Sequence, residues 1–138
     1  MFADVTANPR SAPGGAPPRP PSAAARAALE RFAELSRDVR GGAILADGRV
    51  LAATGNGATW EAAARELIEA ADAAAGEPAV NAHVATEDGE AYMLRDGALA
   101  MVAVTDRFTL ASLVLADMRA ALRELRAEAA RVVAREAA

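Results

Sequence analysis

The chain has 138 residues, no cysteine and a net charge of −4, which comes from 15 basic and 19 acidic residues. This length allows one domain with a modest core. The absence of cysteine excludes disulfides and thiolate metal sites, and the absence of lysine excludes a Walker-type phosphate lysine and Schiff-base chemistry. The acidic balance argues against a nucleic-acid surface, which needs a basic stripe.

The sequence indicates neither export nor membrane insertion. Its first residues lack the basic segment followed by an apolar run that marks a signal peptide. It contains no stretch of about 18 uncharged apolar residues, so we expect no transmembrane helix. We therefore expect a cytoplasmic protein without a membrane partner.

Residues 1–21 form a leader that holds six of the seven prolines. A proline-rich segment without hydrophobic periodicity is typical of disordered or polyproline II chain. We expect this leader to be disordered and residues 22–138 to form a single domain. The run PPRP also has the pattern of a ligand for aromatic grooves, although a solvated tail is the simpler interpretation.

The first predicted helix covers residues 23–38, with Ser22 as its N-cap. Its apolar residues recur at spacings of three and four, which places them on one face. That face consists of Ala25, Leu29, Phe32 and Leu35.

A β-hairpin should follow, with strands at residues 40–46 and 49–54. The pair Asp47-Gly48 between them favours a type I′ turn, which needs positive φ at both central positions. Four successive apolar residues, 43–46, predict a strand that is covered on both faces.

The second predicted helix covers residues 60–75, with Thr59 as its N-cap and Gly76 just beyond its end. Small side chains dominate its apolar stripe, so another helix can approach it closely. The stripe consists of Trp60, Ala64, Leu67, Ile68, Ala71 and Ala75.

Three more strands are predicted at residues 80–86, 90–95 and 99–104. The last is apolar throughout and should lie at the centre of the sheet, whereas 80–86 is the most polar and should form an edge. A final helix over 110–136 carries a long apolar stripe and is longer than the sheet requires.

The resulting order of elements is α-ββ-α-βββ-α, and here the chain resembles the roadblock / dynein light chain family. The similarity lies in the segments VRGGAILADGRVLAATG, WEAAARELIEAADAAAG, VNAHVATEDGEAYMLRDG and LAMVAV, followed by the final helix. The resemblance implies an α+β, profilin-like fold whose five-stranded antiparallel sheet has the order 2-1-5-4-3. Two helices would lie on one face and the middle helix on the other.

The resemblance also implies a function without chemistry of its own. Members of this family usually dimerise through the middle helix and the third strand, and they serve small Ras-like GTPases as platforms or regulators. The sheet argues for a dimer too, because one helix about 10 Å wide cannot cover a face more than about 20 Å wide. We expect a homodimer that binds a small GTPase, through an interface made of Trp60, Ala64, Arg65, Leu67, Ile68, Glu69, Ala71, Asp72 and His83.

Other site hypotheses have weaker support in the sequence. His83 is the only histidine, so it has no partners for a metal site or a recognisable triad. Gly55-x-Gly57 lacks the remainder of a phosphate loop. We therefore expect no catalytic residue, no metal and no cofactor, although an arginine finger from Arg40 or Arg107 is conceivable.

A second class of function is a profilin-like or PAS-like sensory domain that holds a small ligand between a helix and the sheet. In that case Trp60, Tyr92 and Met93 would line the cavity. A hydrolase has less support, because no nucleophile and base occur at a recognisable spacing.

Overall fold

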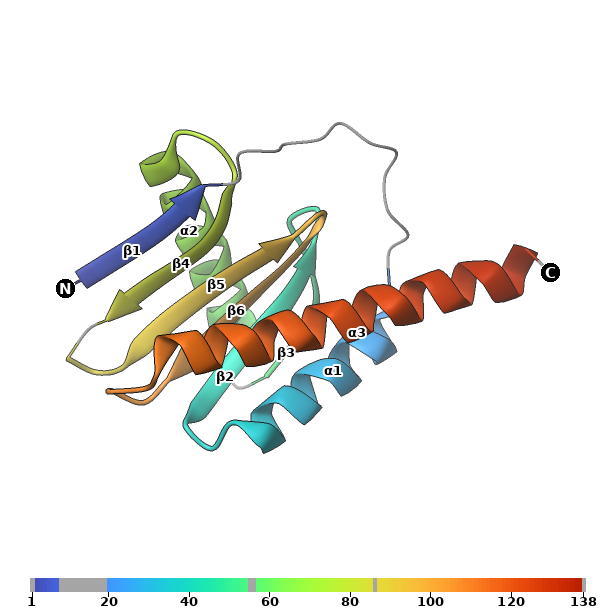
Figure 1. Cartoon of the computed structure of the whole chain (residues 1–138), viewed down its shortest axis with the longest axis horizontal. Coiled ribbons are helices and arrows are strands. Elements are labelled where there is room, and N and C mark those ends of the chain that lie inside the picture. The colour runs from blue at the N-terminus through green and yellow to red at the C-terminus, as the bar shows by residue number, and fades with distance from the viewer. Residues whose placement is uncertain (1, 8–19, 55–56, 86, 138) are drawn as a thin grey trace.

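The computed structural model describes residues 2–7, 20–54, 57–85 and 87–137, which fold into a three-layer α/β/α arrangement (Figure 1). Within these residues lie three helices and six strands, in the chain order β-α-β-β-α-β-β-β-α. The elements are β1 (Phe2–Ala7), α1 (Ser22–Leu35), β2 (Val39–Ala46), β3 (Arg49–Ala53), α2 (Gly57–Ala75), β4 (Ala79–Ala85), β5 (Glu90–Asp96), β6 (Leu99–Thr105) and α3 (Ala111–Ala137).

The sheet is antiparallel and has the order β1-β4-β5-β6-β2-β3. Its last five members reproduce the predicted order 2-1-5-4-3, read from the β3 side. β6 is central, as its continuous apolar sequence predicts. The α+β fold with five core strands is therefore confirmed, and β1 adds a sixth strand to it.

The β2–β3 hairpin turns at Asp47-Gly48 as predicted. Asp47 has φ +50° and Gly48 has φ +79°, the signs that a type I′ turn requires. Residues 43–46 of β2 are all buried. Ala43 and Leu45 face one side of the sheet, and Ile44 and Ala46 face the other, so the predicted cover on both faces is confirmed.

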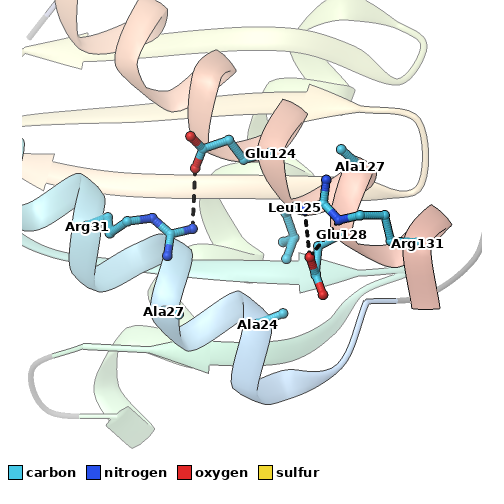
Figure 2. Close-up of a pocket in the computed structure, with 8 residues that line it drawn as sticks. All are labelled: Ala24, Ala27, Arg31, Glu124, Leu125, Ala127, Glu128 and Arg131. Carbon is cyan, nitrogen blue, oxygen red and sulfur yellow. Dashed lines mark hydrogen bonds and ion pairs between the residues drawn. The ribbon is translucent and has the colours of Figure 1, made fainter. Parts of the chain in front are cut away.

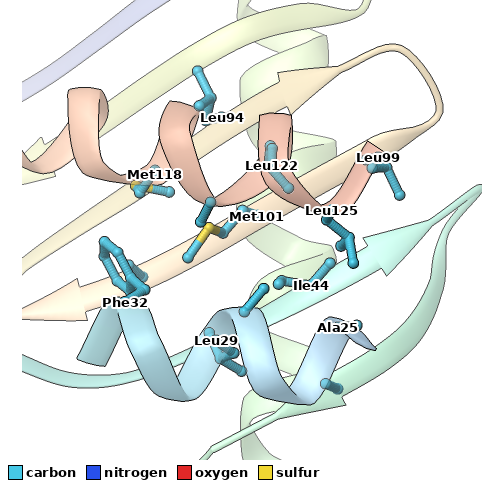
Figure 3. Close-up of a cluster of buried hydrophobic side chains, with 14 of the residues drawn as sticks. Ala25, Leu29, Phe32, Ile44, Leu94, Leu99, Met101, Met118, Leu122 and Leu125 are labelled. Atoms are coloured by element: carbon cyan, nitrogen blue, oxygen red, sulfur yellow. The ribbon is translucent and has the colours of Figure 1, made fainter. Parts of the chain in front are cut away.

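α1 and α3 cover one face of the sheet and enclose the larger of two apolar clusters, the helix-pair cluster (Figure 3). Phe32 and Leu29 of α1 meet Met118 and Leu122 of α3 over Met101 of β6. A buried side chain of this size contributes about 1.5–3 kcal/mol through removal of apolar surface from water. These contacts therefore account for much of the stability of the fold.

α2 lies on the opposite face and encloses a second apolar cluster, the α2 cluster. Alanines dominate it, which brings the helix close to the strands. Its buried members are Ala43, Leu45, Ala64, Ala71, Ala79, Ala82, Met93 and Val102.

The predicted helix ends need small corrections. Pro21 is the N-cap of α1 and forms no side-chain cap bond, while Ser22 is already the first helical residue. The helix ends at Leu35, whose side chain is 79% exposed rather than part of the apolar face. α2 begins at Gly57, so Thr59 lies inside the helix. Gly76 ends α2 as predicted, with φ +73°.

The prediction that residues 1–21 form no packed element is wrong for Phe2–Ala7. These residues form β1, which pairs with β4 from Phe2↔Ala85 to Ala7↔Ala79. Their alternation is short and contains Asp4, so a strand was not evident from the pattern alone. Consequently β4 is not an edge strand, and β1 is the edge. The predictions for residues 8–19 lie outside the described residues.

α3 is the longest helix and extends beyond α1 at its C-terminal end (Figure 1). Val114, Met118 and Leu125 are buried on the sheet side, whereas Arg131 and Arg135 near the end are exposed. Across the described ranges, we find no helix with the length and apolar character needed to cross a membrane.

Candidate partner-binding surface

The outer surface of α2 consists of short and charged side chains. Arg65, Glu66 and Glu69 are exposed, together with Ala70 and Ala73. Arg65 Nε donates to the Gly48 carbonyl at 3.3 Å, which links the helix to the β2–β3 turn. The short side chains leave the helix backbone accessible to a partner, while the charges offer polar contacts around them.

Four of the predicted interface residues point inward or sideways instead. Ala64 and Ala71 are 0% and 3% exposed and pack on the chain's own sheet. Leu67 and Ile68 are half-buried against the same cluster. The apolar stripe of α2 therefore packs into the core of its own chain, and the prediction that Ala64 and Ala71 offer a surface to a partner is wrong.

Asp72 has a structural role at the end of α2. Its carboxylate accepts hydrogen bonds from Arg95 at 2.8 and 3.1 Å and from the Ala79 amide at 2.8 Å. The bond from Arg95 is the main cause of a lowered pKa for Asp72, against a smaller opposing effect of burial. Arg95 also donates to the Ala79 carbonyl. These hydrogen bonds join α2, β4 and β5, and they engage the Asp72 carboxylate within its own chain.

The remaining two interface predictions concern Trp60 and His83. The Trp60 side chain lies outside the described residues, although its backbone is helical. His83 stacks on Tyr92 with ring centroids 4.4 Å apart, and Tyr92 belongs to the helix-pair cluster. His83 therefore lies on the face opposite α2 and does not join the other predicted residues.

A buried carboxylate next to His83 organises a polar network that the sequence interpretation missed. Glu90 is only 8% exposed and accepts from His83 Nε2 at 2.8 Å and from the Thr109 amide at 2.7 Å. The Thr109 hydroxyl also donates to Glu90 and lies 2.7 Å from the Tyr92 hydroxyl. The alternation of side chains along a strand could have indicated this burial, because Glu90 lies on the same face of β5 as the apolar Tyr92 and Leu94.

Burial and hydrogen bonding shift the pKa of Glu90 in opposite directions. Burial acts to raise the pKa of Glu90, but the bonds from Thr109 and His83 outweigh it, and the net pKa is lowered. Burial is also the main cause of the raised pKa of Tyr92, to which the Glu90 charge adds. The carboxylate is thus held ionised as a structural group, with its oxygens occupied by protein donors.

The loop after β6 displays an aromatic ring beside this network. Phe108 has φ +64° and is 86% exposed, with the Arg107 guanidinium carbon 4.6 Å from its ring centroid. Arg40 is engaged by Asp106 and by the Asp88 carbonyl. Of the two arginine-finger candidates, Arg40 therefore makes polar contacts within the chain, and the Arg107 guanidinium lies over the Phe108 ring.

An open groove of about 560 Å³ runs between α1 and α3 (Figure 2). Ion pairs flank it: Arg31 with Glu124 at 3.3 Å, and Arg131 with Glu128 at 2.6 Å. Its apolar lining is limited to Leu125 and short alanine side chains. Exposed pairs of this kind contribute little to binding or stability, so the groove does not have the character of a ligand site.

The cavity expected for a sensory domain does not form as predicted. Tyr92 and Met93 are both fully buried but belong to different clusters on opposite faces of the sheet. They therefore cannot line one cavity. Within the residues that the structure describes, no group of three or more His, Cys, Asp or Glu side chains is arranged to hold a metal ion.

Solved structures with the same architecture include two MglB proteins and a Roadblock/LC7 domain. The chain is similar to MglB of Myxococcus xanthus, with 16% identity over 76% of this chain and 86% of that one and a TM-score of 0.62. It is similar to the gliding protein MglB of Thermus thermophilus, with 16% identity, 95% and 99% coverage and a TM-score of 0.63. A Roadblock/LC7 domain from Streptomyces avermitilis gives 13% identity, 72% and 92% coverage and a TM-score of 0.61.

No family model and no curated protein matches the chain. The structural likeness, at these low identities, shows the fold. The chain therefore has the roadblock fold, as the sequence resemblance predicted.

Proposed function

We propose that this chain is a non-enzymatic interaction module that acts as a dimeric platform or regulator for a small Ras-like GTPase. The observation that carries the proposal is the roadblock fold, shared with two MglB proteins and a Roadblock/LC7 domain over most of their length. The outer surface of α2 supplies a surface of suitable chemistry, with exposed Arg65, Glu66 and Glu69 around short alanine side chains.

Two carboxylates that are engaged by donors of their own fold, Asp72 and Glu90, favour binding over catalysis. Asp72 and Glu90, both with a lowered pKa, are tied to donors of their own fold. A general base needs a free lone pair directed at a substrate, and a general acid needs a raised pKa. Neither carboxylate supports either role, so the proposal assigns no reaction to the chain.

The proposal of a homodimer is supported by the fold. It is not supported by an uncovered face of the sheet. Met93 and Val102 lie at the centre of the α2 face and are 0% and 2% exposed in the single chain. α2 therefore covers the central strands without a second copy, contrary to the expectation from helix and sheet widths. In the proposed dimer, the second copy contacts the flank of α2 that borders β4, so that Arg65 and Glu69 stay available to the GTPase.

Charge reversal on α2 tests the proposed surface. Arg65→Glu and Glu69→Arg should each weaken GTPase binding at least about tenfold, since like charges across an interface cost free energy. Arg123→Glu on α3 is the matched control and should change the dissociation constant less than about twofold, because it lies on the other face. Isothermal titration calorimetry gives the three constants.

All three positions are exposed, so each variant should retain its stability to within about 0.5 kcal/mol. A result in which Arg123→Glu abolishes binding while both α2 variants bind normally would place the partner on the α1/α3 face and remove this assignment.

A further inference from the structure

Exposed apolar side chains gather at one end of the layer formed by α1 and α3. Of the large apolar side chains that are exposed among the described residues, four belong to the end of α1, the loop before α3 or its first turn: Leu35, Phe108, Leu110 and Leu113. Two hydrogen bonds hold these segments together. The Asp106 amide donates to the Asp38 carbonyl at 2.9 Å. The Ser36 hydroxyl donates to Asp117 at 3.1 Å. A grouped set of exposed apolar side chains indicates an interaction surface.

Phe108 is the most exposed of these side chains, and the fold holds it outward. Its φ of +64° lies in a region that residues other than glycine rarely adopt. On one side of Phe108, the Thr109 amide donates to Glu90 at 2.7 Å. On the other side, Asp106 is held by its amide bond to the turn between α1 and β2. Strained backbone that surrounding contacts impose is typical of functional sites. Phe108 is therefore a preorganised anchor, which loses little conformational freedom when a partner binds.

A small hollow between α1 and α3 adjoins this anchor. Its volume is about 90 Å³, and it is lined by Leu35 and Phe32 of α1 together with Asp117 of α3. Arg31 and Glu124 also line it and are shared with the larger groove of Figure 2. The remaining lining is short and apolar: Ala28, Ala120 and Ala121. An enclosed cavity of about 150 Å³ holds a benzene molecule, so an open hollow of this size can seat part of a phenyl ring.

The charges beside the anchor and the hollow are complementary. Within the described ranges, the Arg107 guanidinium lies over the Phe108 ring and makes no ion pair. In the same part of the chain, the Asp117 carboxylate accepts from Ser36 and has no cationic partner. A cation thus accompanies the aromatic anchor, and an anion accompanies the apolar hollow. Because one chain carries both, the partner that fits this surface is a second copy of the chain.

We propose that this end of the α1/α3 layer is a self-association surface, in which Phe108 of each chain enters the hollow of the other and Arg107 meets Asp117 across the interface. Anchor and hollow lie at the same end of the layer, so one two-fold rotation can bring both anchors to both hollows. Leu110 and Leu113 extend the apolar contact around them. Aromatic residues and arginine are the types enriched in protein interfaces.

This surface is separate from the one assigned under the proposed function. α1 and α3 cover the face of the sheet opposite α2, so a copy bound through Phe108 leaves the outer side of α2 free. The proposal therefore goes beyond the homodimer and the GTPase contact, and neither is needed for it. Two two-fold contacts on opposite faces of one chain join dimers into larger assemblies.

Charge reversal in two separate chains tests the contact without a change in the core. Arg107→Asp places like charges across the interface between two identical chains, and so does Asp117→Arg. In a mixture of the two variants, both cross-chain pairs again join opposite charges. By biolayer interferometry, an immobilised Arg107→Asp chain should bind soluble Asp117→Arg at least about tenfold more tightly than soluble Arg107→Asp. Association through α2 adds equally to both measurements.

Phe108→Ser tests the anchor, with Val133→Ser at an exposed apolar position near the end of α3 as the matched control. Introduced into both charge variants, Phe108→Ser should weaken their binding to each other at least about tenfold, and Val133→Ser should leave it within about twofold. Should Asp117→Arg fail to fold, sedimentation equilibrium of Phe108→Ser and Val133→Ser in the otherwise unaltered chain gives the same comparison. Equal binding of the two soluble charge variants, or equal self-association of the two serine variants, would overturn the proposal.

Discussion

Replacement of Ala64 by arginine should prevent folding, whereas the same replacement at Ala70 should leave the fold intact. Both residues lie on α2, six positions apart, but Ala64 is 0% exposed against the sheet and Ala70 is exposed. An arginine at Ala64 would bury an unpaired charge in the α2 cluster, at a cost of at least about 4 kcal/mol. At Ala70 the side chain reaches water, and the change should be within about 0.5 kcal/mol.

Thermal unfolding followed by circular dichroism separates the two variants, since they have the same composition and helix. A folded Ala64→Arg protein with an ordinary melting transition would show that α2 is placed with the wrong side toward the sheet. Ala70→Arg has a second use, because it adds bulk to the proposed partner surface without a change in the core.

Replacement of Glu90 by glutamine should destabilise the protein by about 2 kcal/mol, the range for buried hydrogen bonds to a charged group. The amide keeps the shape of the carboxylate but offers one acceptor oxygen in place of two to Thr109 and His83. For a domain of this length the melting temperature should fall by about 5–10 °C. Glu87→Gln, at an exposed neighbouring position, is the control and should have almost no effect.

The pH dependence of stability gives an independent test of the same carboxylate. Because the pKa of Glu90 is lowered in the folded state, its contribution is fully present above the ordinary value of 4.5 and is lost as the pH falls through the lower folded pKa. The Glu90→Gln variant should lose less stability than the parent as the pH falls, because only the contribution of Glu90 is missing. The contribution of Asp72, whose pKa is also lowered, should remain. Identical acid slopes in the variant and the parent would contradict the network.

The fold could be predicted from the sequence because its local signals agree with one another. The Asp47-Gly48 turn, the apolar run of β6 and the helical spacing in α3 each specify one element, and the tertiary structure changes none of them. β1 could not be predicted in this way. A short edge strand owes its conformation to the β4 backbone beside it, and the residues of β1 themselves carry little periodicity.

The placement of the candidate site on α2 stays a prediction, and the orientation of its residues could not be read from the sequence. The choice of α2 followed from the resemblance, but the inward or outward direction of each residue depends on how the helix sits on the sheet. An alanine stripe has the same pattern whether it meets its own strands or a partner, and only burial distinguishes Ala64 from Ala70. Glu90 was missed because its partner Thr109 lies 19 residues away and the two meet only in the folded chain.

The most direct test of the proposed function is the affinity of the intact chain for a small Ras-like GTPase in its two nucleotide states. If a gene for a small Ras-like GTPase neighbours this one, its product is the first to measure, loaded with GDP or with a non-hydrolysable GTP analogue, by isothermal titration calorimetry. We predict binding that prefers one state at least about tenfold, because the switch segments order around the γ-phosphate. Equal affinity for the two states, or hydrolysis of GTP by the chain alone, would contradict the proposed function.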